Sequence, residues 1–349
     1  MHRLFSVLIL LVTTNGFAAD VANLYQSQIA VTSQSDAERD NVSAAVLRQV
    51  ILKVVGDKKL VDATDILPIL AQSKQLVQQY QYQRTNIISE DLTEPDRLQI
   101  VMSFKERSIN NELIALELPI WGRSRPETLV WMAIDDEGKS SVLGADADDD
   151  VLKLLKQAAE VRGLPILLPV MDLQDQSQVR DSDLALGFSE SVEQASLRYG
   201  TPVILMANAK INSNGTMRIH WHARINGESE LWQSQGSKLT ALQAGIDELA
   251  DRLARRFSQH TVLSGEKQHL TLQISGLRDY ADYVRIDSYL SDVQNVSNVQ
   301  VSSLSVDKVE FRIDFNGDLD TFKRIVSINR VLIEAPYSPT DTLNYRLSP

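Results

Sequence analysis

The sequence of 349 residues contains no cysteine, so a disulfide, a thiolate metal site and a cysteine nucleophile are all excluded. The glycine motifs that bind phosphates or dinucleotides are also missing, as is the H-E-x-x-H zinc motif. After residue 19 no apolar run approaches the roughly 20 residues that cross a bilayer as a helix. We therefore expect no cofactor, no bound metal and no transmembrane span in the body of the chain.

Basic residues are in the minority. The chain has 35 Lys and Arg against 46 Asp and Glu, a net charge of −11. Such a surface repels nucleic-acid phosphates and anionic lipid headgroups, so nucleic acid is not an expected partner. Without disulfides, stability must come from apolar burial, for which a chain of this length has room in two or three domains.

The first 18 residues have the composition of a secretory signal peptide. A positive start at His2 and Arg3 precedes an apolar run that ends at Val12. As a helix this run would cover about 14 Å, roughly half of a bilayer core, which argues against a permanent anchor. We expect cleavage near Ala18 or Ala19 and export from the cytoplasm.

The remaining chain divides into three α+β regions, a junction and a tail. Their expected bounds are residues 20–118, 127–262 and 267–335 for the three domains, 119–126 for a linker-like junction, and 336–349 for a tail without periodicity. The tail is expected to be extended or loosely ordered. The predicted fold class is α+β, with three small mixed α/β domains.

In the first region Ser35 and Glu38 form a capping box that begins a helix, and Gly56 ends this helix. A second helix is expected after Asp65, and a closing helix is expected to be capped by Ser108. A strand near residues 80–84 and an alternating strand near 98–104 complete this α+β unit.

In the middle region residues 128–134 predict a strand buried on both faces. A meander of three strands follows, with turns at Asn214-Gly215 and Asn226-Gly227. Thr240 and Gln243 predict a capping box for a helix that packs on the meander. The expected order β-α-β-α-β-β-β-α makes a mixed sheet covered by helices.

The third region has the order β-α-β-β-α-β, which is typical of a ferredoxin-like domain. Leu270, Leu272 and Ile274 alternate in its first strand, and Asp279 is placed to cap the helix that follows. Residues 331–333 are expected to close the sheet.

Two patterns resemble metal sites but favour simpler interpretations. His220 and His222 share a strand face with Arg218 and Arg224, whose charges disfavour a bound cation, so a solvated face is expected. The acidic run at residues 146–150 lacks the glycine and glutamate of a calcium loop and is better placed at a helix N-terminus. The fragment at residues 187–191 lacks the last glycine of a hydrolase nucleophile elbow, so its serine is expected to cap a helix.

The remaining candidates for binding are Trp121, Arg123 and Arg125 in the junction, and Asp172 and Asp175 in an acidic loop. Tryptophan and arginine dominate interface energetics, so the junction could form a partner-binding patch. An interdomain clasp is the preferred interpretation, since such junctions commonly bury aromatic residues. The acids could line a pocket, although solvated acids also collect in loops.

Several blocks together resemble an uncharacterised family of exported proteobacterial proteins, domain of unknown function number two thousand and sixty-six. The blocks are W-G-R-S-R-P-E-T-L-V-W at residues 121–131, R-G-L-P-I-L-L-P-V-M-D at 162–172 and S-L-R-Y-G at 196–200, with the opening helix segment at 25–39. The resemblance covers nearly the whole chain after the leader and implies a location in the Gram-negative periplasm. It brings no catalytic residue and no ligand.

These observations favour a non-enzymatic exported envelope protein that binds another envelope protein or a cell-wall component. The alternative is a hydrolase that acts on an envelope polymer through the loop carboxylates, for which paired acids in a cleft would be required. A receptor for a small ligand would need a large apolar pocket between domains. The sequence specifies neither the partner nor the oligomeric state.

Overall fold

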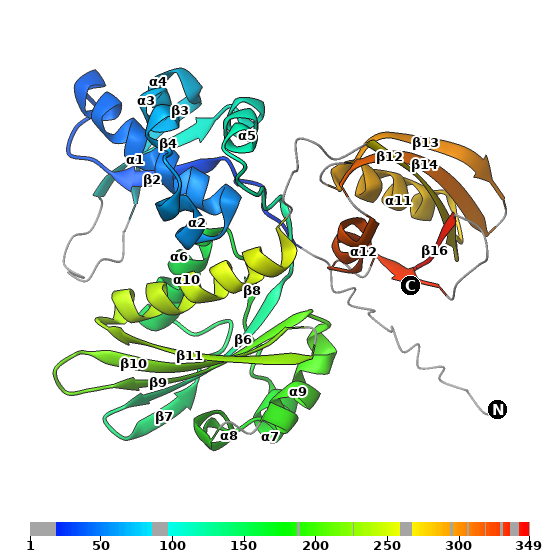
Figure 1. Cartoon of the computed structure of the whole chain (residues 1–349). Coiled ribbons are helices and arrows are strands. Elements are labelled where there is room, and N and C mark those ends of the chain that lie inside the picture. Colours follow the sequence, from blue (N-terminus) through cyan, green and yellow to red (C-terminus); the bar gives the residue numbers. More distant parts are fainter. Residues whose placement is uncertain are drawn as a thin grey trace, which may run out of the picture.

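The computed structural model describes residues 19–85, 97–186, 189–225, 227–258, 267–293, 296–305, 307–317, 319–328, 331–335 and 342–348. Figure 1 shows three units, each built on its own sheet with helices packed against it. This arrangement confirms the predicted α+β class with several small mixed units. The predicted leader lies outside the described residues. Within the described ranges no helix is long and apolar enough to span a membrane.

The first unit packs its helices on a three-stranded sheet of order β2-β4-β3. Its elements are β2 (Gln26–Ala30), α1 (Asp36–Val55), α2 (Lys58–Ala63), α3 (Leu67–Ala71), α4 (Ser73–Leu76), β3 (Val77–Thr85), β4 (Arg97–Phe104) and α5 (Glu106–Ala115). Both predicted ends of α1 are confirmed. Ser35 accepts a hydrogen bond from the Glu38 N–H, and Gly56 ends the helix with a φ of 80°.

Two local predictions in this unit are wrong in part. The helix expected after Asp65 is divided into α3 and α4, and α2 was not anticipated. The closing helix α5 begins at Glu106, so Ser108 lies inside it rather than at its cap. Short helices such as α2 lack the repeated apolar spacing from which a helix is predicted.

The junction is not a linker. Its strand β5 (Ser124–Arg125) pairs with β1 (Ala19–Asp20), and Ile120 belongs to the core of the first unit while Trp121 belongs to the core of the second. The chain therefore passes from one hydrophobic core directly into the next.

The second unit has a mixed sheet of order β11-β10-β9-β6-β7, with β8 paired to β6. Its elements are β6 (Thr128–Asp136), β7 (Lys139–Val142), α6 (Asp150–Arg162), β8 (Ile166–Leu167), α7 (Leu173–Gln178), α8 (Asp181–Leu186), α9 (Ser189–Ser196), the 3-10 turn η1 (Leu197–Tyr199), β9 (Val203–Ile211), β10 (Met217–Ile225), β11 (Glu228–Gly236) and α10 (Lys238–Phe257). The predicted acidic loop is thus partly helical, and β7 was not predicted.

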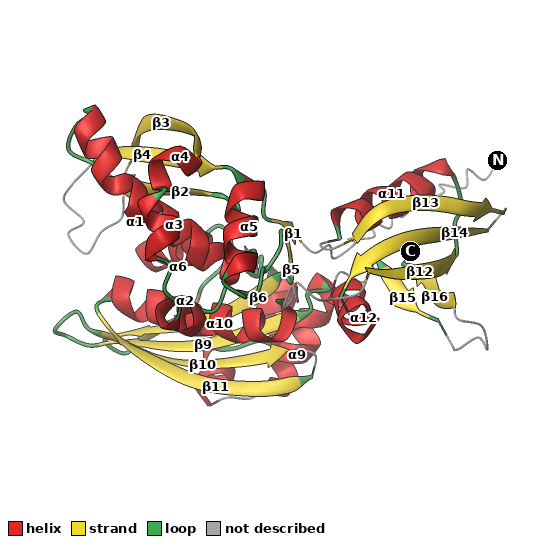
Figure 2. Ribbon diagram, turned by 45° about the horizontal axis from the view of Figure 1, so that its top comes forward, coloured by secondary structure: helices red, strands yellow, loops and turns green. Residues whose placement is uncertain are grey.

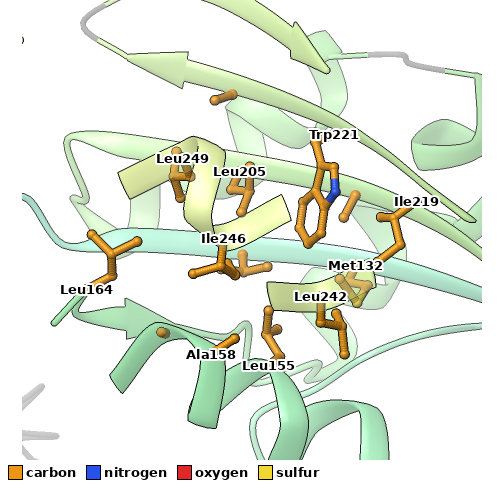
Figure 3. Close-up of a cluster of buried hydrophobic side chains, with 14 of the residues drawn as sticks. Met132, Leu155, Ala158, Leu164, Leu205, Ile219, Trp221, Leu242, Ile246 and Leu249 are labelled. Carbon is orange, nitrogen blue, oxygen red and sulfur yellow. The ribbon is translucent and has the colours of Figure 1, made fainter. Parts of the chain in front are cut away.

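Helices cover both faces of the second sheet. Leu155 and Ala158 of α6, together with Ile246 and Leu249 of α10, pack against one face, and Figure 3 shows these side chains around Trp221. Residues of α8 and α9 pack against Trp131 on the other face. The interior strand β6 is therefore buried on both sides, as predicted.

The cap of α10 differs from the prediction. Ser237 is the N-cap and accepts a hydrogen bond from the Thr240 N–H, so Thr240 and Gln243 lie within the helix. A serine three residues earlier competes for the same role, and the apolar face of the helix does not distinguish the two starts.

The third unit has a five-stranded sheet of order β13-β14-β12-β16-β15. Its elements are β12 (Lys267–Ser275), α11 (Tyr280–Asp292), β13 (Val296–Leu304), β14 (Lys308–Asn316), α12 (Leu319–Ile328), β15 (Leu332–Glu334) and β16 (Thr342–Leu347). Figure 2 shows this unit beside the other two. Asp279 caps α11 as predicted.

The tail prediction is wrong for Thr342–Leu347. This segment forms β16, which is parallel to β12 and antiparallel to β15, so it occupies the place beside β12 that the ferredoxin-like order reserves for the last strand. The predicted closing strand is displaced to the edge of the sheet. Only Tyr345 and Leu347 of β16 are buried, which is too few for an alternating pattern to stand out in the sequence.

Candidate functional site

The junction places Trp121 and Arg125 inside the protein rather than on a partner-binding surface. Their relative exposures are 2% and 0%. The Arg125 guanidinium lies over the Trp121 ring, with 4.0 Å from Cζ to the ring centroid. Such a stacked cation is stabilised by the negative face of the indole.

Arg125 donates hydrogen bonds to five backbone carbonyls. The acceptors are Gly122 at 3.0 Å, Arg162 at 2.8 Å, Gly163 at 3.0 Å, Lys53 at 2.6 Å and Trp121 at 3.1 Å. Lys53 lies in the last turn of α1, and Arg162 and Gly163 end α6. A cation is favourable at helix C-termini, where unpaired carbonyls carry partial negative charge. Arg125 therefore joins the ends of two helices from different units.

Burial, followed by the neighbouring Arg162 cation, lowers the pKa of Arg125 to about 9. The guanidinium consequently remains protonated at neutral pH. Five carbonyl acceptors compensate for much of the hydration that the buried charge has lost.

Arg162 forms a second contact across the same boundary. It donates to the Gly56 carbonyl at 2.7 Å and pairs with Asp251 and Asp247 of α10, each at 2.7 Å. The Lys58 N–H also donates to the Asp251 carboxylate, at 3.0 Å. We call Trp121, Arg125 and Arg162 the junction clasp. This clasp fixes the first unit against the second.

Arg123 lies in different surroundings from Arg125. It is partly exposed, pairs with Glu106 at 2.6 Å and donates to the Ala22 carbonyl at 3.0 Å. Of the three predicted junction residues, it is the one with a side chain available to solvent.

Asp172 and Asp175 are brought together, but as the partners of Arg198. Arg198 contacts Asp172 at 2.9 Å and Asp175 at 3.1 Å, and the Tyr199 hydroxyl donates to Asp175 at 2.5 Å. Asp175 is fully buried and also accepts from the Met171 N–H. We call these four side chains the Arg198 cluster. It connects the start of α7 to the turn after α9.

The Arg198 cluster has clear electrostatic consequences. Hydrogen bonds from Arg198 and from the first-turn N–H groups lower the pKa of Asp172 to about 2. Burial raises the pKa of Tyr199 to about 12. Asp172 therefore acts as a fixed anion, not as a proton donor near neutral pH. Arg198 was not singled out in the sequence, although it lies in the S-L-R-Y-G block.

A cleft lies between the first and second units, with a volume of about 690 Å³. We call it the interunit cleft. Its walls come from all of β2, from Gln49 and Lys53 of α1, from Gln99 and Val101 of β4, and from α6 and the segment after it, including Lys156, Gln157, Glu160 and Ile166. The volume is within the usual range for ligand sites. The sequence did not predict it because its walls come from two units.

Lys53 is the most unusual group in the interunit cleft. Its side chain is 5% exposed, and its ammonium donates to the Gln26 carbonyl at 2.9 Å. Burial lowers the pKa of Lys53 to about 8, with Glu160 opposing this effect and Arg125 adding to it. Gln99 is 6% exposed, and its Oε1 has no hydrogen-bond partner among the described residues.

A second, polar pocket of about 500 Å³ lies on the opposite face of the second sheet from α10. Asp135, Asp181, Lys210, Arg218 and His220 are among its lining residues. The sequence correctly placed Arg218 and His220 on the strand face turned away from the core.

The candidate metal residues have other roles in the structure. His222 contacts the Ser229 hydroxyl at 3.1 Å, and burial lowers its pKa. The acidic run begins α6, where Asp149 caps the helix and Lys153 pairs with Asp148. Three acidic or histidine side chains do not converge as a metal site anywhere in the described ranges. Ser189 begins α9, but its side chain lies outside the described residues.

A family model described as a domain of unknown function, DUF8605, matches residues 18–122. The match covers the first unit and ends within the junction. It agrees with the expectation of an uncharacterised family, but its number differs from the one named from the sequence blocks, two thousand and sixty-six. No curated protein matches the chain.

Solved structures show only weak likeness. Competence damage-inducible protein A (ComA) from Klebsiella pneumoniae subsp. pneumoniae MGH 78578 has 13% identity and a TM-score of 0.21, with 43% of this chain and 92% of that protein covered. A competence or damage-inducible protein from Enterobacter asburiae has 12% identity and a TM-score of 0.22, with coverage of 43% and 93%. At these scores the likeness does not define a common fold.

Proposed function

We propose that this chain is a non-enzymatic protein of the Gram-negative periplasm that binds a segment of another envelope protein in the interunit cleft. Export is supported by the leader-like composition of residues 1–18. Binding is supported by a preformed cleft whose two walls are held at a fixed separation by the junction clasp. Rigid walls reduce the entropy that is lost when a ligand is captured.

The chemistry of the walls favours a protein segment over a glycan. Backbone groups and glutamine side chains line the interunit cleft, and none of its described lining residues is aromatic. An exposed strand edge can pair with the backbone of an extended peptide, and a glycan has no such backbone. The observation that carries this proposal is that all five residues of β2 line the cleft.

The hydrolase alternative has less support from the geometry. A glycosidase-type mechanism needs one carboxyl group with a raised pKa to act as a general acid. Asp172 and Asp175 are committed to Arg198 and Tyr199. Asp181 lines the polar pocket, but the Ser140 hydroxyl and nearby N–H groups lower its pKa. These carboxylates are therefore better suited to accepting hydrogen bonds than to donating protons.

Site-specific photocrosslinking in intact cells tests the proposal. A photoreactive residue at Gln157, in the wall of the interunit cleft, is expected to give one or a few discrete adducts with envelope proteins. The matched control is the same residue at Lys139, which is exposed on the β7 hairpin and outside the cleft. Identical adduct patterns from both positions, or no adduct from Gln157, would contradict binding in the cleft.

A further inference from the structure

Among the described strands, β2 is an edge strand that pairs with β4 alone. Two hydrogen bonds at the ends of the β2–β4 ladder show which residues of β2 bond to β4. The Phe104 N–H donates to Tyr25 O, and the Val31 N–H donates to Leu98 O. In an antiparallel ladder alternate residues bond to the neighbour, so Ser27 and Ile29 also face β4. The N–H and C=O groups of the residues between them must point away from β4.

The free edge of β2 faces the interunit cleft. The lining residues come from both sides of the sheet, with Gln49 and Lys53 of α1 on one side and Gln99 and Val101 of β4 on the other. The cleft therefore passes around β2 itself. Figures 1 and 2 both place β2 on the side of its sheet that is nearest α6.

The free edge is limited to two residues. The Gln26 N–H already donates to Asn23 O, and the Gln26 carbonyl accepts from Lys53. Gln28 and Ala30 remain, each with one donor and one acceptor on the cleft side. An unpaired, accessible edge of this kind is the template on which an extended peptide adds as a strand.

Charge in the cleft selects the peptide further. Among the described residues that line it, Lys53, Arg97 and Lys156 are cationic and Glu160 is acidic, although the whole chain carries a net charge of −11. Lys53 is buried where the free edge ends, and no carboxylate lies within ion-pair distance of it among the described residues. An incoming carboxylate would compensate for this buried cation.

Building on the proposed function, we propose that the interunit cleft takes an extended peptide segment of the partner as an additional strand on β2. The segment pairs with the backbone of Gln28 and Ala30 and places an acidic side chain beside Lys53. A donor on the segment satisfies the buried Gln99 Oε1. The ligand class is thus an acidic segment from within a polypeptide, bound mainly through its backbone.

Selection from a random linear peptide library provides the test. The peptides are displayed with both ends fused, so that no free terminus is present, and are selected on the purified protein. Enriched sequences are then synthesised with acetylated N-termini and amidated C-termini, and their affinities are measured by calorimetry. We expect the enriched peptides to share a run in which every second residue is β-branched. We also expect one acidic residue at a fixed position relative to this run.

Three variants identify the binding mode. Ala30→Pro removes one edge N–H outside the β2–β4 ladder, a position where proline is tolerated, and is expected to weaken binding at least about tenfold. Ala30→Ser retains this N–H and should bind as the parent protein does. Lys53→Met retains the buried stem and removes the charge. Selection on this variant should therefore no longer favour an acidic residue at the fixed position of the peptide.

The outcomes separate this inference from the proposed function. No enrichment above that on the Ala30→Pro protein, enrichment without an acidic position, or failure of the enriched peptides to bind once both their ends are capped would overturn the inference. If strand addition alone is wrong, the cellular adduct at Gln157 persists and is unaffected by Ala30→Pro. If the proposed function is wrong, this adduct is absent whichever peptides bind.

Discussion

Arg125 and Arg198 each tie together segments that are distant in sequence, but their partners differ. Arg125 is fully buried and donates to five backbone carbonyls. Arg198 is about one-third exposed, with a side-chain exposure of 32%, and pairs with two carboxylates. Carbonyls do not titrate and cannot be removed by changing a side chain, whereas carboxylates can be neutralised. The comparison shows how one residue type makes a contact that either withstands acid or depends on pH.

The largest expected effect is the loss of the buried guanidinium. Arg125→Met should lower the free energy of unfolding by about 4 kcal/mol, because carbonyls at two helix ends are left buried without donors. Urea denaturation followed by tryptophan fluorescence measures this change, since Trp121 lies against Arg125.

Arg123→Met is the matched control in the same sequence block. Arg123 is partly exposed and its ion pair with Glu106 is solvated, so the change should stay within about 1 kcal/mol. Equal losses for the two variants would refute the assignment of the junction clasp to Arg125.

A smaller effect is expected in the Arg198 cluster. Asp175→Asn should destabilise the protein by about 2 kcal/mol, because the new amide presents N–H groups to donors from Arg198, Tyr199 and the Met171 backbone. Asp183→Asn, which affects an exposed contact with the Arg180 N–H, should change stability by about 0.5 kcal/mol or less. Thermal unfolding of the two variants provides the measurement, and equal shifts would show that the hydrogen bonds accepted by Asp175 do not stabilise the fold.

The smallest effect is a dependence on acid. The pKa of Asp172 is lowered to about 2 in the folded protein, mainly by Arg198, from an ordinary value of 3.8. A carboxyl group with a depressed folded pKa stabilises the protein fully above its ordinary pKa, and this contribution is lost as pH falls toward about 2. The effect is modest because the side chain is 42% exposed.

Asp172→Asn should therefore reduce the drop in Tm between about pH 4 and pH 2, relative to the parent protein, while lowering Tm at pH 5. Differential scanning calorimetry across this range tests the sign. A parallel shift at every pH would mean that the Asp172 carboxylate does not contribute through its charge.

Local signals in the sequence predicted much of the fold. Ser35 and Gly56 bound α1 because capping depends on residues within one turn. The strand β10 shows strict alternation because one of its faces packs on α10, and Gly163 ends α6 in the left-handed conformation. These features require only short stretches of sequence.

Features that depend on distant partners were not predictable in the same way. The five acceptors of Arg125 come from three separate segments, and the composition of residues 119–126 resembles that of a linker. Even the nearest residues of the two walls of the interunit cleft, Val101 and Lys156, are 55 residues apart in sequence. Arg198 pairs with acids 23 and 26 residues away, a spacing with no local signature.

The position of β16 has a consequence for biosynthesis. This strand lies between β12 and β15. The sheet of the third unit is therefore incomplete until Thr342–Leu347 has been synthesised and can pair with both neighbours. Of the strands in this sheet, β16 is synthesised last, and it inserts between two strands that are made before it. A chain shortened before Thr342 would leave two open strand edges on this unit, and self-association through them is the expected fate of such a product.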